Sequence, residues 1–261
     1  MAIKKRSIIY DFGGNNGTID GQGKMWWELW WNRTLWNSHN VLISNLTFRN
    51  SPFWTIHPVY CSNVVIKDMT ILASLNAPNT DGIDPDSCSK VCIEDCYIES
   101  GDDLVAVKSG WDQYGIATAH PSSDIIVRRV SGTTPTCSGV GIGSEMSGGI
   151  LNVTIEDLHV WDSAAGIRIK TDIGRGGYIA NINISNVIME RVKISIRFSR
   201  GSNDHQMRDG TRKPFLEPCL RWHEGFPFEQ ICTKNISLFG LPPPVKWHCE
   251  FLSRALLSVL R

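Results

Sequence analysis

The 261-residue sequence lacks an excess of either charge. Its 26 lysine and arginine residues balance 26 aspartate and glutamate residues, and the sequence pI is about 7.0. Proteins that attract nucleic acid or an anionic membrane through a broad field carry a basic excess. We therefore expect neither nucleic acid nor a membrane among the partners, and a bound polyanion would need a local group of positive charges.

Long apolar runs and a leader segment are also missing. No stretch reaches the roughly 18 consecutive apolar residues of a membrane-spanning helix. The N-terminal stretch MAIKKRSIIYDFGG begins with basic residues but lacks the apolar core and the cleavage site of a signal peptide. Secretion is nevertheless indicated by six Asn-x-Ser/Thr sequons, at Asn16, Asn32, Asn45, Asn152, Asn183 and Asn235. Sequons without a leader predict a glycoprotein chain that is truncated at its N-terminus.

The cysteines lack the spacing of metal ligands. The sequence contains eight of them, none in a Cys-x-x-Cys pair or at a zinc-type distance from histidine. We therefore predict no metal site. The even number is compatible with disulfides, and their connectivity stays open.

A short strand-like repeat is present, without helical patterns between its copies. The copies cover residues 40–48, 63–71, 90–98, 124–130, 152–160 and 181–189, so that successive offsets are 23, 27, 34, 28 and 29 residues. β-branched residues alternate with polar ones, as in half-buried strands. Such internal periods predict an all-β solenoid of stacked coils. A β-sandwich, whose strands recur about every 8–12 residues, is the alternative.

Two acidic stretches follow one another on this repeat. NTDGIDPDSC covers residues 79–88, and SGDDLVAVKSG covers residues 100–110. Asp81 precedes Asp102 by 21 residues and Asp103 by 22, which is close to one short coil. Since stacked strands lie about 4.8 Å apart, the carboxylates should lie side by side on one outer face. Their repulsion would cost stability unless a function required it.

Clustered carboxylates have two common uses in proteins. One is Ca²⁺ binding through oxygen ligands. The other is general acid/base chemistry, in which crowding raises one pKa so that a protonated acid coexists with ionised bases. Downstream, GIRIKTDIG at residues 166–174 places Arg168 and Lys170 on the same side of a strand. Two such cations suit a substrate that is itself an acid, such as a uronic-acid polymer, and a surface ladder of ion pairs is the alternative.

Four motifs in order resemble the polygalacturonase (pectinase) family of glycoside hydrolases, in particular its plant and bacterial branch. They are NTDGID, GDD, GSEMSGG and RIK, and the similarity runs from about residue 18 to about residue 204. The resemblance implies a single-stranded, right-handed parallel β-helix. It predicts one domain over residues 1–261, with a repeat region at about 18–204 and a divergent segment at about 205–261.

The resemblance also implies a site and a reaction. Asp102 would be the general acid, and Asp81 and Asp103 would position and activate water. Arg168 and Lys170 would bind a galacturonate carboxylate. The reaction would be hydrolysis of α-1,4 links in pectic polysaccharide with inversion, by a monomer that is secreted to the cell wall and needs no cofactor. Roles for the nearby Asp84, Asp86 and His57 are expected to be supporting or structural.

The match departs from the family at residue 138. Relatives carry a histidine before their Ile-Gly-Ser, and Ser138 occupies that position in TCSGVGIGSEMSGG. A serine lacks the charge with which a histidine would tune the acids. Links near residue 37 and after residue 205 are also short or divergent. Two further hypotheses therefore stand beside the hydrolase: an impaired or truncated β-helix that binds pectin, and a Ca²⁺-dependent pectate lyase with an arginine base.

Overall fold

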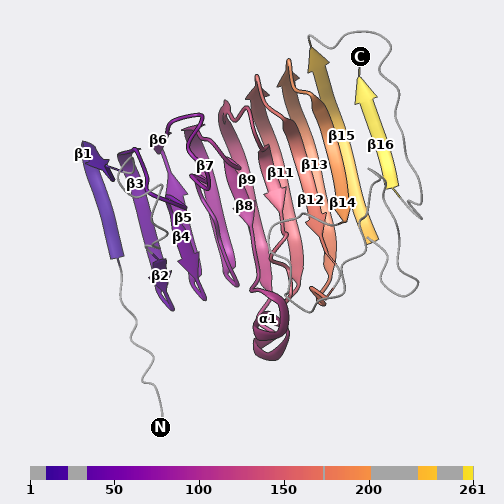
Figure 1. Cartoon of the computed structure of the whole chain (residues 1–261), viewed down its shortest axis with the longest axis horizontal. Coiled ribbons are helices and arrows are strands. Elements are labelled where there is room, and N and C mark those ends of the chain that lie inside the picture. Colours follow the sequence, from indigo (N-terminus) through magenta and orange to yellow (C-terminus); the bar gives the residue numbers. More distant parts are fainter. Residues whose placement is uncertain (1–9, 23–33, 173, 201–228, 240–254, 261) are drawn as a thin grey trace.

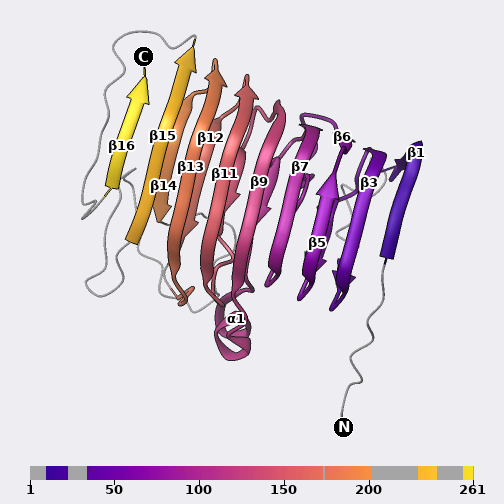
Figure 2. The ribbon, with the colours of Figure 1, turned by 180° about the vertical axis from the view of Figure 1, so that it is seen from behind.

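The computed structural model of the chain describes residues 10–22, 34–172, 174–200, 229–239 and 255–260. Parallel strands lie side by side along one long axis (Figures 1 and 2). They form a ten-stranded sheet, a four-stranded sheet and a two-stranded sheet. Because successive strands of one sheet come from successive turns of the chain, the described part is a stack of coils.

The large sheet follows the long axis of the molecule. It contains β1 (Tyr10–Asp20), β3 (His39–Arg49), β5 (Ser62–Lys67), β6 (Thr70–Leu72), β7 (Ser89–Glu99), β9 (Ser122–Thr133), β11 (Ile150–Trp161), β13 (Ile179–Glu190), β15 (Glu229–Phe239) and β16 (Ala255–Leu260). The four-stranded sheet contains β8 (Val105–Val107), β10 (Ser138–Ile142), β12 (Ala165–Thr171) and β14 (Ile194–Arg200), and the small sheet contains β2 (Thr34–Trp36) and β4 (His57–Val59).

The repeat found in the sequence sets how the strands of the large sheet pair. The first aliphatic residue of each copy pairs with that of the next copy, in the order Val41, Val64, Val91, Ile125, Val153 and Ile182. The six predicted copies are therefore successive coils. All of these pairings are parallel, which a two-layer antiparallel sandwich would not give.

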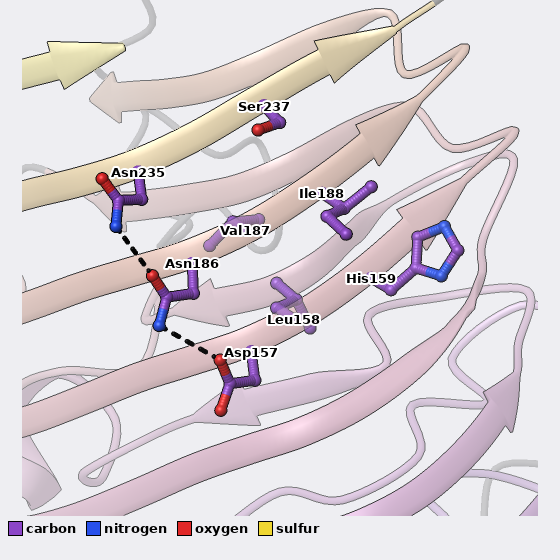
Figure 3. Close-up of a pocket in the computed structure, with 8 residues that line it drawn as sticks. All are labelled: Asp157, Leu158, His159, Asn186, Val187, Ile188, Asn235 and Ser237. Carbon is purple, nitrogen blue, oxygen red and sulfur yellow. Dashed lines mark hydrogen bonds between the residues drawn. The ribbon is translucent and has the colours of Figure 1, made fainter. Parts of the chain in front are cut away.

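Two polar positions in each copy bend the strand. In one copy Asn152 and Asp157 have φ values of 56° and 53°, and in the next Asn181 and Asn186 have 56° and 54°. Asn and Asp tolerate this left-handed region better than most residues, which explains their recurrence in the repeat. Their side chains form ladders between coils: Asn186 Nδ2 donates to Asp157 Oδ1 at 3.2 Å, and Asn235 Nδ2 donates to Asn186 Oδ1 at 3.1 Å (Figure 3).

The side chains that point inward form one continuous core. Val153 and Ile155 of β11 are fully buried, as are Val105, Val140 and Ile167 of the four-stranded sheet. The large sheet thus covers one side of the core, and the four-stranded sheet supports the outward-facing residues on the other side.

A short helix, α1 (Asp112–Thr118), lies in the longest interval between copies of the repeat. It connects β8 to β9 and protrudes from the lower edge of the stack in Figure 1. The sequence pattern did not indicate it, because seven residues are too few to establish a helical period. No helix in the described ranges is long and apolar enough to cross a membrane.

The C-terminal segment adds strands to the large sheet. β15 pairs with β13, so that Ile231 lies beside Ile182, and β16 pairs with β15. Residues 205–228 and 240–254 of the predicted divergent segment lie outside the described residues. Six described cysteines carry free thiols, namely Cys61, Cys88, Cys92, Cys96, Cys137 and Cys232, and the other two lie outside the described residues.

Candidate active site

The candidate site lies on the outward face of the four-stranded sheet. Successive side chains of a strand point to opposite faces, so Gly141 and Arg168, which pair with each other, face away from the core beside buried neighbours. A Cβ at Gly141 would lie 2.6 Å from Oδ2 of Asp103. The glycine therefore leaves room for that carboxylate to lie across the sheet.

Asp81 and Asp103 lie on neighbouring coils, as their spacing predicts. The N–H of Gly82 donates to the carbonyl oxygen of Asp103 at 3.0 Å. Both side chains point away from the core and yet are almost fully covered, with exposed fractions of 3% and 0%. The lysines Lys108 and Lys170 pack over them, at 3.9 Å from Asp81 Oδ2 and 2.7 Å from Asp103 Oδ2. The sequence predicted an outer face and did not indicate this burial.

Asp103 is held as an ionised carboxylate. Burial alone would raise its pKa, but the adjacent Lys170 ammonium, the Lys170 hydrogen bond and the N–H of Ser138 outweigh burial and hold the pKa below its usual value. Ser138 N donates to Oδ1 at 2.8 Å and Lys170 Nζ donates to Oδ2 at 2.7 Å. Ser138, at the predicted position of a histidine, thus contributes its backbone N–H to the acid.

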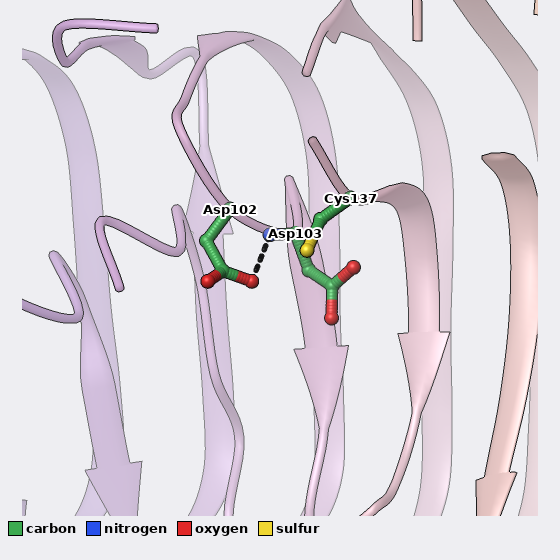
Figure 4. A group of neighbouring side chains, drawn as sticks. All are labelled: Asp102, Asp103 and Cys137. Atoms are coloured by element: carbon green, nitrogen blue, oxygen red, sulfur yellow. Dashed lines mark hydrogen bonds between the residues drawn. The ribbon is translucent and has the colours of Figure 1, made fainter. Parts of the chain in front are cut away.

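The neighbouring Asp102 is shifted in the opposite direction. Burial raises its pKa, and repulsion from Asp103 raises it further. Its Oδ1 accepts the N–H of Asp103 at 2.8 Å (Figure 4). Its own N–H donates to Ser100 Oγ at 2.9 Å. The opposite shifts make Asp102 the better proton donor and Asp103 the better proton acceptor, which is the division of roles that acid/base catalysis requires.

The thiol of Cys137 lies beside these two acids (Figure 4). The potential ligand atoms of Asp102, Asp103 and Cys137 lie within 4.8 Å of one another. Ca²⁺ prefers six to eight oxygen ligands. Here one donor is sulfur, burial raises the thiol pKa so that it stays protonated, and both Asp103 oxygens already accept hydrogen bonds. The group therefore fits Ca²⁺ poorly.

Asp81 and Asp84 form a second acidic group in the same region. Burial raises the pKa of both, and mutual repulsion raises that of Asp81. Asp84 is fully buried, and neither of its carboxyl oxygens has a hydrogen-bond partner among the described residues. Lys108 opposes these shifts through its positive charge. We conclude that Asp84 holds a proton more readily than an ordinary aspartate.

Asp84→Asn is therefore expected to stabilise the protein at neutral pH. A carboxyl whose folded pKa is raised stabilises the fold below its unfolded pKa, and this contribution is lost as the pH rises through the folded value. The substitution should raise the free energy of unfolding at pH 7 by about 1–3 kcal/mol. The gain should shrink near pH ~4, the ordinary aspartate pKa. Urea titrations at both pH values measure it, and a loss of stability at pH 7 would contradict the assignment.

Lys108, Glu145 and Trp54 complete the site and were not predicted from the sequence. Lys108 Nζ lies 3.3 Å from Glu145 Oε2 and 4.3 Å from the centre of the Trp54 ring. Burial would lower the lysine pKa, but Glu145 and then Asp84 and Asp81 outweigh it and raise the pKa. Burial is likewise outweighed at Glu145, whose pKa is lowered to about 2. Alternate residues of a strand point to the same face, which is how the sequence indicated Arg168 and Lys170. The same rule could have indicated Lys108, because it lies two residues after Ala106, the partner of the outward-facing Gly141.

Arg168 and Lys170 take different partners. Lys170 reaches back to the acids, whereas Arg168 is half-buried and its Nε donates to Ser199 Oγ at 3.2 Å on the following coil. Asp86 serves the turn, since its Oδ1 accepts the N–H of Gly110 at 2.7 Å. His57 is 5% exposed and places Nε2 at 3.5 Å from Asp86 Oδ2. These two residues therefore support the turn and do not join the carboxylate group.

Comparison with known proteins identifies the family of the chain. The sequence profile of glycosyl hydrolases family 28 matches residues 4–206, which is most of the chain. The chain belongs to this family. A probable polygalacturonase of Vitis vinifera is 44% identical over 235 residues, covering 86% of this chain and 47% of that protein. An endo-polygalacturonase of Pectobacterium parmentieri is 33% identical, covering 67% of this chain and 47% of that protein.

Solved structures of family 28 share the fold. An exopolygalacturonase from Thermotoga maritima is 31% identical and superposes with a TM-score of 0.64, covering 78% of this chain and 50% of that chain. The predicted right-handed parallel β-helix is thereby confirmed, and the β-sandwich alternative is wrong. The family 28 chain spans about half the length of the curated relatives that it matches.

Proposed function

We propose that the chain hydrolyses α-1,4-galacturonosyl links in pectic polysaccharide with inversion. The observation that carries this proposal is the opposite pKa shift of the two adjacent acids, Asp102 upward and Asp103 downward. Glycoside hydrolysis by inversion needs one carboxylic acid and one carboxylate that activates water. Family membership and the names of the matched relatives support the galacturonan substrate.

In the proposed mechanism, the protonated Asp102 donates its proton to the glycosidic oxygen as the bond to the anomeric carbon breaks. A water molecule attacks that carbon from the opposite face, and its proton passes to the Asp103 carboxylate. Asp81, whose pKa is raised, positions this water. Lys170 keeps Asp103 ionised by direct contact, and Lys108 offsets the negative charge beside Asp81. The ion pair with Lys170 therefore separates the base, Asp103, from the acid, Asp102.

The substrate carboxylate is proposed to bind between Arg168 and Lys170. Arg168 uses Nε for Ser199, and no described residue hydrogen-bonds its two Nη groups, which can therefore bind a carboxylate. A methyl-esterified galacturonate has no such charge. The proposal therefore favours de-esterified galacturonan as the substrate. Exposed sequon asparagines, among them Asn45 and Asn183, support a secreted, cell-wall location.

The proposal predicts the products formed from polygalacturonic acid. Reducing ends should accumulate without new ultraviolet absorbance, and EDTA should not change the rate. A lyase would instead create an unsaturated, absorbing product and would stop with EDTA if it used Ca²⁺. A folded protein that released no product while still binding the polymer would leave only the binding function.

A further inference from the structure

Two arginines lie side by side on the last coils of the four-stranded sheet. Arg168 of β12 and Arg197 of β14 are direct partners in the parallel register. Ile196 and Phe198, on either side of Arg197, pack against the core, so Arg197 points outward as Arg168 does. The two guanidinium groups therefore share the face that carries the candidate active site.

Arg197 has no counter-charge within the described ranges. It is exposed, and no hydrogen bond or ion pair joins its guanidinium to another described side chain. Burial and then repulsion from Arg168 lower its pKa. Like charges directly opposite each other on neighbouring strands destabilise a sheet. By contrast, Arg191 on the preceding turn contacts Asp162 at 2.7 Å, as a surface arginine commonly does.

We propose that Arg197 forms a second carboxylate subsite, which binds the uronate residue next to the one held by Arg168 and Lys170. This inference rests on the proposed function, because it assigns a neighbouring residue of the same substrate chain. An anion placed there would relieve the repulsion between the two arginines. A guanidinium also matches a carboxylate in a planar, two-pronged geometry.

The spacing of the coils matches the spacing of the substrate. Neighbouring strands lie about 4.8 Å apart, and a 1,4-linked pyranose ring advances its chain by a similar length. A galacturonan that runs along the helix axis thus places consecutive uronate rings opposite the coils of Arg168 and Arg197, where the long arginine side chains can reach their carboxylates. Ser199, which is 9% exposed, fixes Arg168 from the same coil as Arg197 and so holds the pair in place.

The affinity of the Arg197→Gln variant for tetragalacturonate tests this subsite directly. The full chain would be prepared with Asp102→Asn to prevent turnover, with and without Arg197→Gln, and titrated with tetragalacturonate by calorimetry. Loss of one charge-assisted contact should weaken the affinity about tenfold. Galacturonic acid itself should bind both proteins equally, because its one carboxylate takes the Arg168 and Lys170 position. Arg191→Gln is the matched control and should bind tetragalacturonate as the parent does.

Fully methyl-esterified tetragalacturonate provides the second arm. It should bind the two proteins equally, since it offers no charge to Arg197. Equal affinity of both proteins for the unesterified tetramer, or an equal loss in Arg191→Gln, would overturn the subsite. If the wild-type chain releases no reducing ends but tetramer binding still depends on Arg197, hydrolysis fails and the subsite stands. If the wild-type chain is active and the affinity for the unesterified tetramer does not depend on Arg197, only the subsite is overturned. If the protein binds neither tetramer, the subsite is overturned as well.

Discussion

Asp102→Asn is expected to lower the rate of polygalacturonate hydrolysis by about 10²–10⁴-fold. The raised pKa of Asp102 gives it a proton to donate, and an amide of the same shape cannot donate one to the leaving oxygen. The amide oxygen can still accept the N–H of Asp103, which Asp102 Oδ1 accepts at 2.8 Å. The fold should therefore persist while the chemical step is lost.

Initial rates of reducing-end formation and thermal unfolding curves measure both parts of this prediction. The matched control is Asp157→Asn, because Asp157 is an exposed bend residue whose Oδ1 accepts from Asn186 at 3.2 Å and asparagine keeps that acceptor. Unchanged activity in Asp102→Asn would remove this residue from the reaction. A collapse of thermal stability in the same variant would mean that the lost activity reports unfolding.

The pH profile separates a general acid from a merely structural residue. Activity should fall as the pH rises through the raised pKa of Asp102, because the acid then loses its proton. It should also fall as the pH drops far enough to protonate Asp103, whose pKa is lowered. In Asp102→Asn any residual activity should lose the fall at high pH and keep the fall at low pH.

The sequence predicted the stack of coils because each coil repeats the same local chemistry. Alternating β-branched residues mark the strands, and the Asn or Asp at each bend marks the register, as Asn152 and Asp157 do. The short helix α1 was not predicted, because it occurs once, between two coils, and is too short to show a helical period. A repeated coil can thus be predicted from the sequence, whereas an element that occurs only once between coils cannot.

The sequence predicted those neighbours in the candidate site that are separated by the length of one coil. Asp81 and Asp103 are 22 residues apart, and the backbone places them on adjacent coils. The contact between Lys170 and Asp103 spans 67 residues and crosses the coil that carries Gly141, so no single spacing indicates it. Burial was equally unpredictable, because it depends on which lysines fold back over the acids. Burial raises the pKa of both Asp102 and Asp103, and the contacts of Asp103 with Lys170 and Ser138 then separate the two values.

Lys170→Met should remove both stability and activity. It leaves Asp103, which is fully buried, without its ammonium partner. Breaking a buried ion pair from one side costs about 3–5 kcal/mol. The pKa of Asp103 is lowered in the native protein, so the pair stabilises the fold above the unfolded pKa of about 4. The loss should therefore be largest at neutral pH and shrink as acid protonates Asp103.

The double variant Lys170→Met with Asp103→Asn distinguishes the two consequences. Removing both charges leaves no uncompensated ion in the interior, so most of the lost free energy of unfolding should return at pH 7. Activity should not return, because the proposed base, Asp103, and the proposed ligand of the substrate carboxylate, Lys170, are both gone. Denaturant titrations of the single and double variants give the coupling energy. If the double variant were as unstable as the sum of the single variants, Lys170 would stabilise the fold through packing and not through Asp103.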